Sequence, residues 1–434
     1  MKIPSRFRAH MIDQGMDVLS TFFVPRIHLL VDFEGSLDRD RLAAALRLCL
    51  DAEPVLGCRF VPRWIRPYWA RLPKDQLDRS QLLQSGQDVD SFLAGDFDEK
   101  RGPQLRALLV PGEKGDRLVL KVNHQAADAG GVKELGYLLA RLYRKVKDDP
   151  GYRPTPNLGS RSLFQVYRRF LPWRFFGLLG RSIRELLGNL RPYKSMPWPS
   201  GVQKAGTPVY VFKHFSKQRL EAVRSLVSEY NATQNDLMVT AMLRALVEHT
   251  GWSPETALRL TGTVDLRRYL PDRRGRAICN LSSFYFVNLG YELGLSFKET
   301  LARVKKQIDK LKTDYFGLGF IFVSYLNSLP YPFALARILL RKFFHRIQLS
   351  GNMPPGMTNM GIIDDHLLDF GNPRVSTAML ATPASQPPML VSGLTGFRDS
   401  LSFSIGFYES AVVRARMEEL FETVDRELPG KVIS

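Results

Sequence analysis

The sequence has few cysteines and no apolar run long enough to cross a membrane. Its 434 residues include three cysteines, Cys49, Cys58 and Cys279, which are too few and too scattered for a disulfide framework or a zinc site. The basic N-terminus also lacks the continuous apolar core of a signal peptide. These absences disfavour secretion and a metal site, and they predict a protein of a reducing, cytoplasmic compartment.

Acidic residues are scarce relative to basic ones. The chain carries 61 Lys and Arg against 43 Asp and Glu, a net charge of +18, which favours anionic partners such as phosphates, nucleic acid or an anionic membrane. Much of the excess is local: residues 161–194 hold eight Arg or Lys and one Glu, interleaved with aromatic and aliphatic residues. Residues 331–349 likewise combine apolar residues at helical spacing with Arg and Lys.

What is present in quantity is ordinary globular material. With 44% hydrophobic and 24% charged residues, the chain can bury substantial cores. Its length predicts two domains, residues 1–150 and 206–434, joined by a basic, aromatic and Pro-containing connection over residues 151–205.

Apolar periodicity alternates between strand and helix patterns in both halves, which predicts an α/β (α+β) fold with a mixed sheet and helices in each domain. Ser36 is well placed to cap the first long helix, and Thr233 with Asp236 forms a capping-box pattern. The expected strands are 23–35, 56–61, 118–123, 207–215, 257–267, 281–292, 391–397 and 401–409, and the expected helices are 37–54, 132–146, 220–230, 237–251 and 297–311.

The stretch LVLKVNHQAADAGG, residues 118–131, places a histidine and an aspartate four apart between an expected strand and an expected helix. Imidazole can accept and return a proton near neutral pH, and a loop at a strand end can present it to a cleft. His124 is therefore a candidate general base. The spacing alone is a weak motif, since a polar loop would produce it as well.

Other segments of the sequence match the same family pattern and support the interpretation of His124 as a catalytic residue. The sequence resembles the CoA-dependent acyltransferase superfamily of the chloramphenicol acetyltransferase fold, which includes condensation domains, BAHD acyltransferases and bacterial alcohol or lipid acyltransferases. Its HxxxDG signature is matched by His124 to Gly130, except that Ala129 stands where the pattern has glycine. The other matching stretches, in chain order, are VDLRRYLPDRRGRAICN from Val264 to Asn280, TNMG from Thr358 to Gly361 and DFGNP from Asp369 to Pro373.

The resemblance implies roles for these residues. It implies two chloramphenicol acetyltransferase-like domains with the active site in a tunnel between them, His124 as general base, and a salt bridge from Asp128 to Arg267 that makes Asp128 structural. Gly130 belongs to the same loop. The possible oxyanion or substrate contacts are Asn280, Ser282, Ser283, Thr358 and Asn359, for each of which a purely structural role is the main alternative.

The implied reaction moves an acyl group from an acyl-CoA or acyl-carrier phosphopantetheine thioester to a hydroxyl or amine of an apolar or lipid-like acceptor, with neither a metal nor a permanently bound cofactor. We expect a monomer acting in lipid metabolism. The alternative is a catalytically degenerate relative that binds a ligand or a carrier protein.

The basic aromatic segments admit two interpretations at this point. They form either interfacial helices on an anionic membrane surface, or helices that pack on their own domain while the arginines face water or CoA phosphates. Nucleic acid binding is not expected, because no binding motif accompanies the charge.

Overall fold

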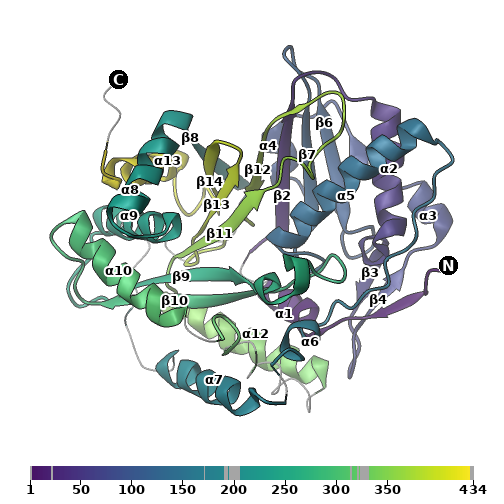
Figure 1. Ribbon diagram of the computed structural model, residues 1–434. Helices are drawn as coiled ribbons and strands as arrows, with labels where there is room; N and C mark the ends of the chain where they lie inside the picture. Colours follow the sequence, from purple (N-terminus) through teal and green to yellow (C-terminus); the bar gives the residue numbers. More distant parts are fainter. Residues whose placement is uncertain are drawn as a thin grey trace.

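The protein folds into two lobes, each built around one β-sheet, which lie side by side with helices on their outer faces (Figure 1). The computed structural model describes residues 2–20, 23–170, 172–189, 194, 206–312, 315–319, 322 and 332–430. The two-lobed α/β architecture expected from the sequence is confirmed.

The first lobe, on the right in Figure 1, contains a five-stranded sheet in the order β12-β2-β7-β6-β5. Apolar residues of its strands pack with those of helices α2 and α5 in one core. The strands are β2 (Arg26–Phe33), β5 (Leu83–Gln84), β6 (Leu105–Val110), β7 (Arg117–Asn123) and β12 (Val375–Ala381), and the helices are α2 (Arg39–Ala52), α3 (Lys74–Asp78), α4 (Val89–Ala94) and α5 (Ala129–Asp148). A small sheet in the order β1-β4-β3 joins β1 (Arg6–Arg8), β4 (Tyr68–Arg71) and β3 (Cys58–Val61), with a 3₁₀ turn at Pro54–Gly57.

The second lobe contains a six-stranded sheet in the order β10-β9-β11-β13-β14-β8. Its core lies between this sheet and helices from the second half of the chain. The strands are β8 (Pro208–Phe215), β9 (Leu258–Asp265), β10 (Ser282–Gly290), β11 (Gly356–Ile363), β13 (Val391–Phe397) and β14 (Ser400–Tyr408), and the helices are α8 (Lys217–Glu229), α9 (Gln234–Thr250), α10 (Phe297–Leu311) and α13 (Arg414–Glu427).

The remaining elements lie at the junction of the lobes and on the lower side in Figure 1. They are α1 (Met11–Leu19), α6 (Phe164–Tyr167), α7 (Phe175–Asn189), α12 (Phe333–Ser350) and the 3₁₀ helices Leu266–Tyr269 and Pro271–Arg273. A third core, containing Leu163, Val166 and Tyr167, packs the beginning of the connection against Leu266 and Leu281 of the second lobe. The predicted domain boundaries themselves stay a prediction.

Strand β12 crosses between the lobes. It follows β11 of the second sheet in sequence, yet pairs antiparallel with β2 of the first sheet, with Leu380 opposite Leu29. Both side chains are buried in the first core. The first lobe is therefore completed by a strand that lies more than 200 residues later in the chain.

Most expected elements are present, with ends that differ by a few residues, and the cap predicted for one helix is different. Helix α2 begins after Asp38, whose side chain accepts a hydrogen bond from the Arg41 backbone N–H at 3.0 Å, so the prediction of Ser36 as its cap was wrong. The cause is tertiary: Leu37 is buried and its N–H donates to the carboxylate of Asp116 at 2.8 Å, which keeps the chain extended for two further residues. The capping box of Thr233 is confirmed.

The crossing strand makes a testable demand on stability. Leu380→Ala should lower the free energy of unfolding by about 2–5 kcal/mol, because it opens a cavity in the core of the lobe that the strand joins. Ser376→Ala, in the same strand but only partly buried, is the matched control and should change it by less than about 0.5 kcal/mol. Urea denaturation followed by circular dichroism measures both, and equal effects would contradict this assignment of the core.

Candidate active site

The predicted histidine motif forms the link between β7 and α5. His124 directly follows the last residue of β7, and its N–H donates to the Pro25 carbonyl at 2.7 Å. Asp128 caps the helix, accepting a hydrogen bond from the Gly131 N–H at 2.8 Å. A strand end on one side and a capped helix on the other therefore fix the loop that carries the imidazole.

Asp128 is bound to the second lobe by a buried ion pair with Arg267. One carboxylate oxygen lies 2.9 Å from Arg267 Nη2, and the other accepts from Arg267 Nη1 at 3.1 Å. The second oxygen also accepts from the Leu281 N–H at 2.7 Å and from the Ser282 hydroxyl at 2.6 Å. Arg267 in turn donates to the Cys279 carbonyl at 2.8 Å. The contact implied by the family resemblance is thus present, and both carboxylate oxygens are occupied by donors other than the imidazole.

The surroundings keep both partners of this pair charged. Burial raises the pKa of Asp128, but the charge of Arg267 and the hydrogen bonds from Arg267, Ser282 and Gly131 together outweigh burial, and the net pKa falls below its usual range. Burial likewise lowers the pKa of Arg267, yet the nearby carboxylates of Asp128, Asp265 and Glu134 hold it well above the ordinary value. Both side chains therefore stay charged at neutral pH, and neither is suited to give or take a proton there.

The glycine requirement of the motif has moved by one residue. Ala129 is the first residue of α5 and has no positive φ, so its backbone needs no glycine. At Gly130, by contrast, an added Cβ would lie 2.6 Å from Arg267 Nη1 and 3.0 Å from Asp265 Oδ2. Because the guanidinium is held by several carboxylates, it cannot easily yield. The departure at Ala129 is therefore compatible with the loop, and Gly130 is the position where only hydrogen fits.

Asn280 fixes the tautomer of the His124 ring. Its Nδ2 group donates to the carbonyls of His124 and Gln125 at 2.9 and 3.1 Å, which uses both amide hydrogens and turns Oδ1 toward the imidazole. Oδ1 lies 3.2 Å from His124 Nδ1. Since Oδ1 can only accept, Nδ1 carries the hydrogen and Nε2 is left with its lone pair. The amide thus serves the imidazole, and this geometry leaves it no hydrogen for an oxyanion.

Burial also keeps this imidazole neutral. The ring is half-buried and packs near Phe23, with ring centroids 5.9 Å apart. Burial lowers the pKa of His124, and the opposing influence of Asp128 and of hydrogen bonds, including that to Asn280, only partly offsets this. The net pKa lies below the ordinary 6.5, so the ring is an unprotonated base at neutral pH.

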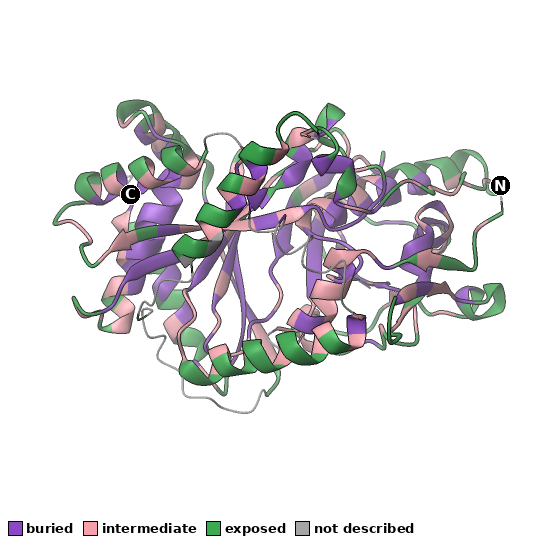
Figure 2. Ribbon diagram, turned by 90° about the horizontal axis from the view of Figure 1, so that it is seen from below, coloured by how far each residue is buried: buried purple, intermediate pink, exposed green. Residues whose placement is uncertain are grey.

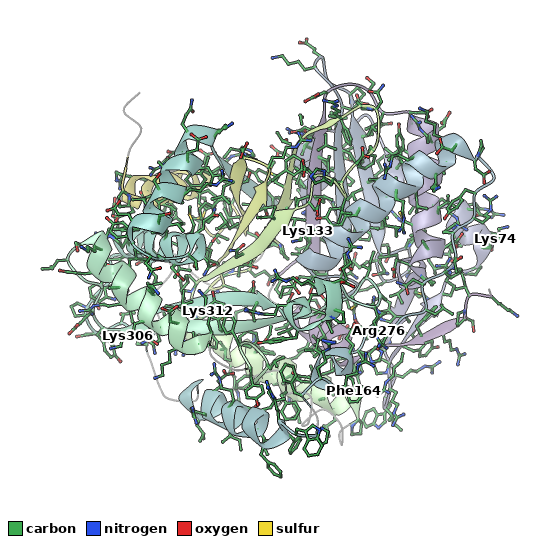
Figure 3. The ribbon with its side chains drawn as sticks, viewed as in Figure 1. Lys74, Lys133, Phe164, Arg276, Lys306 and Lys312 are labelled. Carbon is green, nitrogen blue, oxygen red and sulfur yellow. The ribbon has the colours of Figure 1, made fainter. Side chains whose placement is uncertain are left out.

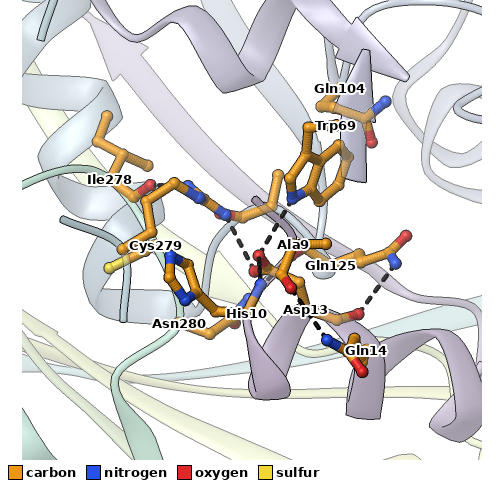
Figure 4. Close-up of polar contacts among 12 residues, drawn as sticks. Ala9, His10, Asp13, Gln14, Trp69, Gln104, Gln125, Ile278, Cys279 and Asn280 are labelled. Carbon is orange, nitrogen blue, oxygen red and sulfur yellow. Dashed lines mark hydrogen bonds and ion pairs between the residues drawn. The ribbon is translucent and has the colours of Figure 1, made fainter. Parts of the chain in front are cut away.

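A buried network of hydrogen bonds and ion pairs, which the sequence did not reveal, holds the histidine loop on the side of α1 (Figure 4). Arg161 donates to the carbonyls of Ala126 and Ile278 and lies 3.1 Å from Asp13 Oδ1 on α1. Gln125 donates to the Asp13 carbonyl at 2.9 Å. The sequence placed Arg161 at the start of the basic tract, but the residue is 8% exposed. No local pattern could have found it, because its partners lie 35 to 148 residues away.

The other candidate donors lie in different places. Ser282 donates to Asp128, whereas Ser283, the next residue of β10, faces the opposite side of the strand by the alternation of side chains. The Thr358 hydroxyl pairs with that of Thr263, and the exposed Asn359 donates to Asn235 at 3.3 Å. Within the described part of the chain, neither Thr358 nor Asn359 forms a hydrogen bond with His124. Their predicted roles, like those of the other site residues, stay predictions.

A cleft of about 930 Å³ opens next to the ion pair, on the side of α5. Gly130 and Arg267 contribute to its wall, and Lys133, labelled between the lobes in Figure 3, lines it from α5. Acidic and basic side chains line it in nearly equal number. Among the described residues that line the cleft, Arg267 of the ion pair is present and His124 is not. The cleft therefore reaches the ion pair but not the imidazole. The tunnel implied by the resemblance stays a prediction.

Among the described residues, the thiols and the potential metal ligands form no second reactive centre. Burial raises the pKa of Cys279 to about 12, which suppresses the thiolate that a nucleophile would need. Within the ranges given above, no three His, Cys, Asp or Glu side chains gather where they could hold a metal ion.

Solved structures with this arrangement cover nearly the whole chain. The first condensation domain of the calcium-dependent antibiotic synthetase, in complex with a substrate analogue, superposes with a TM-score of 0.68 at 18% identity, covering 97% of this chain and 95% of that one. The chain has the condensation-domain fold. The same fold is found in the epimerization domain of the third module of tyrocidine synthetase B (TM-score 0.66, 14% identity, 98% and 97% covered). It is also found in the TRI3 trichothecene 15-O-acetyltransferase of Fusarium sporotrichioides (TM-score 0.72, 12% identity, 98% and 95% covered).

Sequence comparisons reach less far than the fold. An uncharacterized protein of Mycobacterium tuberculosis is 31% identical over 160 residues, 34% of this chain and 37% of that protein. The malformin synthetase of Aspergillus brasiliensis is 29% identical over 123 residues, which is 27% of this chain and 2% of the synthetase. The chain thus matches well under half the length of these relatives. No family model matches it.

The pair of residues after Asp128 allows a direct test. Gly130→Ala should lower the free energy of unfolding by about 1–3 kcal/mol, because the new methyl group displaces the Arg267 guanidinium. Ala129→Gly restores the family pattern one position earlier and should cost no more than about 1 kcal/mol, the usual helix-propensity difference. Urea titration of the two variants measures this, and a larger loss for Ala129→Gly would contradict the reassigned glycine requirement.

Proposed function

We propose that the protein transfers an acyl group from a thioester to a hydroxyl or amine, with His124 as the general base. The observation that carries this proposal is the orientation of Asn280, which leaves Nε2 of a neutral imidazole as a proton acceptor. The condensation-domain fold supports the reaction class, and one structural neighbour is named as an acetyltransferase.

In the proposed reaction the acceptor O–H or N–H gives its proton to Nε2 while its heteroatom attacks the thioester carbonyl. Formation of the new C–O or C–N bond gives a tetrahedral intermediate. When the intermediate collapses, the C–S bond breaks and the imidazolium returns the proton to the leaving thiolate. No covalent acyl-enzyme is needed, and holding donor and acceptor beside one base supplies much of the rate through proximity.

The Asp128–Arg267 pair has a positioning part in this proposal. The carboxylate oxygens of Asp128 bind Arg267, Leu281 and Ser282, so in this proposal Asp128 does not relay protons from His124. Because Leu281 directly follows Asn280, the pair also holds the backbone that presents the tautomer-fixing amide. The electrostatic effect of Asp128 on His124 is to raise its pKa, which burial more than offsets.

The proposed donor is an acyl-CoA or an acyl group on the phosphopantetheine of a carrier protein, and the proposed acceptor is apolar or lipid-like. The chain acts as a monomer and keeps no bound cofactor in this proposal. A relative that only binds such ligands is the competing function. The presence of Ala129 in place of the motif glycine does not favour it, because the backbone at Ala129 needs no glycine.

Replacing the base separates the two functions. His124→Ala should lower the rate of CoA release from a panel of acyl-CoA donors, in the presence of alcohol or amine acceptors, by about 10²–10⁴-fold. His345→Ala, a substitution of an exposed histidine on α12, is the control and should leave the rate unchanged. Equal, slow release by wild type and both variants would favour the binding protein.

The acidity of His124 sets the pH dependence. The protonated ring cannot act as base, so kcat/KM should fall as the pH drops through the His124 pKa, which burial places below 6.5. The midpoint of the acid limb of the kcat/KM profile should therefore lie below pH 6.5. A pH profile with its acid limb above 6.5 would show that another group, or a charged histidine, controls the rate.

A further inference from the structure

Helix α12 is turned with Arg337 and Arg341 toward the protein and with several apolar residues toward solvent. Arg337 Nε donates to the Asp17 carboxylate of α1 at 2.6 Å, and Arg341 donates to the Asp17 carbonyl at 3.1 Å. On the opposite face, Leu339 and Phe343 are 56% and 55% exposed. A helix that packs on its own domain normally buries such residues, so this orientation leaves an apolar face at the surface of the protein.

The hairpin between β3 and β4 extends this apolar face. Its tip reads Arg63-Trp64-Ile65-Arg66, and Trp64 and Ile65 are 65% and 64% exposed. Their carbonyls accept hydrogen bonds from the Ala334 and Phe333 N–H groups at 3.0 and 3.2 Å, which joins the tip to the first turn of α12. We call the joined set the outer apolar surface; it comprises Trp64, Ile65, Leu335, Ile338, Leu339 and Phe343.

The charge around this surface has one sign. Arg63 and Arg66 flank the tip, and Lys342 and Arg346 are exposed on α12. Neither α12 nor residues 62–67 contain an acidic residue. Aliphatic and aromatic side chains bordered by cations are the pattern by which a helix lies in the interface of an anionic bilayer, with the chains of Arg and Lys reaching the headgroups.

A second helix repeats the pattern on the same side of the molecule. On α7, Phe176, Ile183 and Leu187 recur at helical spacing and are 81%, 46% and 60% exposed, while Leu178 on the inner face is buried. Trp173, just before the helix, is 93% exposed. Figure 1 places α7 and α12 on the lower side, and Figure 2, seen from that side, shows helices with exposed residues there.

We propose that the outer apolar surface binds the face of a bilayer that contains anionic lipids, with α12 parallel to the membrane plane. None of the described helices combines the length and apolarity needed to span a bilayer, so α12 would lie on the membrane and not across it. A second copy of the chain fits less well, because a two-fold contact would bring Lys342 and Arg346 against their own copies without an acidic partner. This inference is independent of the role proposed for His124.

Vesicle flotation tests the proposal on the whole chain. Wild-type protein should float with vesicles of phosphatidylcholine containing 30% phosphatidylglycerol, and much less with phosphatidylcholine alone or in high salt. The double variant Leu339→Ser with Phe343→Ser should reduce the partition coefficient by about tenfold or more. Leu295→Ser, at a 95% exposed leucine beside α10, is the matched control and should bind as wild type does.

Tryptophan quenching gives a readout that does not depend on stability. Brominated phosphatidylcholine within the anionic vesicles should quench the fluorescence of Trp64, and the variant Trp64→Phe should lose that part of the quenching. The proposal is overturned if wild type does not float with anionic vesicles at low salt, or if the double variant floats equally well. It is also overturned if light scattering shows a wild-type dimer that the double variant disrupts without vesicles, since the surface would then bind a second copy.

Discussion

The buried ion pair between Asp128 and Arg267 is the interaction on which the site depends. It joins the capped start of α5 in the first lobe to the segment that follows β9 in the second, and both side chains are at most 3% exposed. Taking two charges out of water is unfavourable unless hydrogen bonds satisfy them, and here the Leu281 N–H and the Ser282 hydroxyl complete the carboxylate shell. Removal of one partner would leave an uncompensated buried charge, typically a loss of about 3–5 kcal/mol.

From this pair the orientation of the His124 ring follows step by step. The pair places Leu281, the preceding Asn280 binds two carbonyls of the histidine loop, and the remaining amide oxygen selects the protonated nitrogen of His124. The sequence motif contains both His124 and Asp128, yet their connection runs through a residue more than 150 positions away. We infer that the aspartate controls the histidine through backbone placement and not through direct proton exchange.

Local chemistry predicted the parts of the fold that local interactions determine. Helix α10 begins and ends where the pattern places it, because its capping box of Ser296 and Glu299 and its apolar stripe lie within the segment itself. The start of α2 was misplaced because a distant carboxylate, Asp116, holds the chain extended. Strands β11 and β12 were not predicted at all, since what makes the second a strand of the first lobe is its pairing with β2.

The candidate site divides in the same way. His124, Asp128 and Arg267 could be predicted because the family resemblance marks them in the sequence. The loop could not be judged from Ala129 alone, since the contact that excludes a side chain is between Gly130 and a guanidinium more than 130 residues later. Arg161 was grouped with the other basic residues of the connection, because composition carries no information on which member of a basic segment is buried.

Helix α1 has two acidic residues one turn apart, and each is held by arginines from a different part of the chain. Asp13 forms an ion pair with Arg161, which also binds the loop after His124. Asp17 forms ion pairs with Arg337 and Arg341 of α12. We infer that this nine-residue helix connects the outer apolar surface to the loop that carries His124. A shift of α12 would therefore act on α1 through Asp17, and through Asp13 and Arg161 on the loop that carries the imidazole.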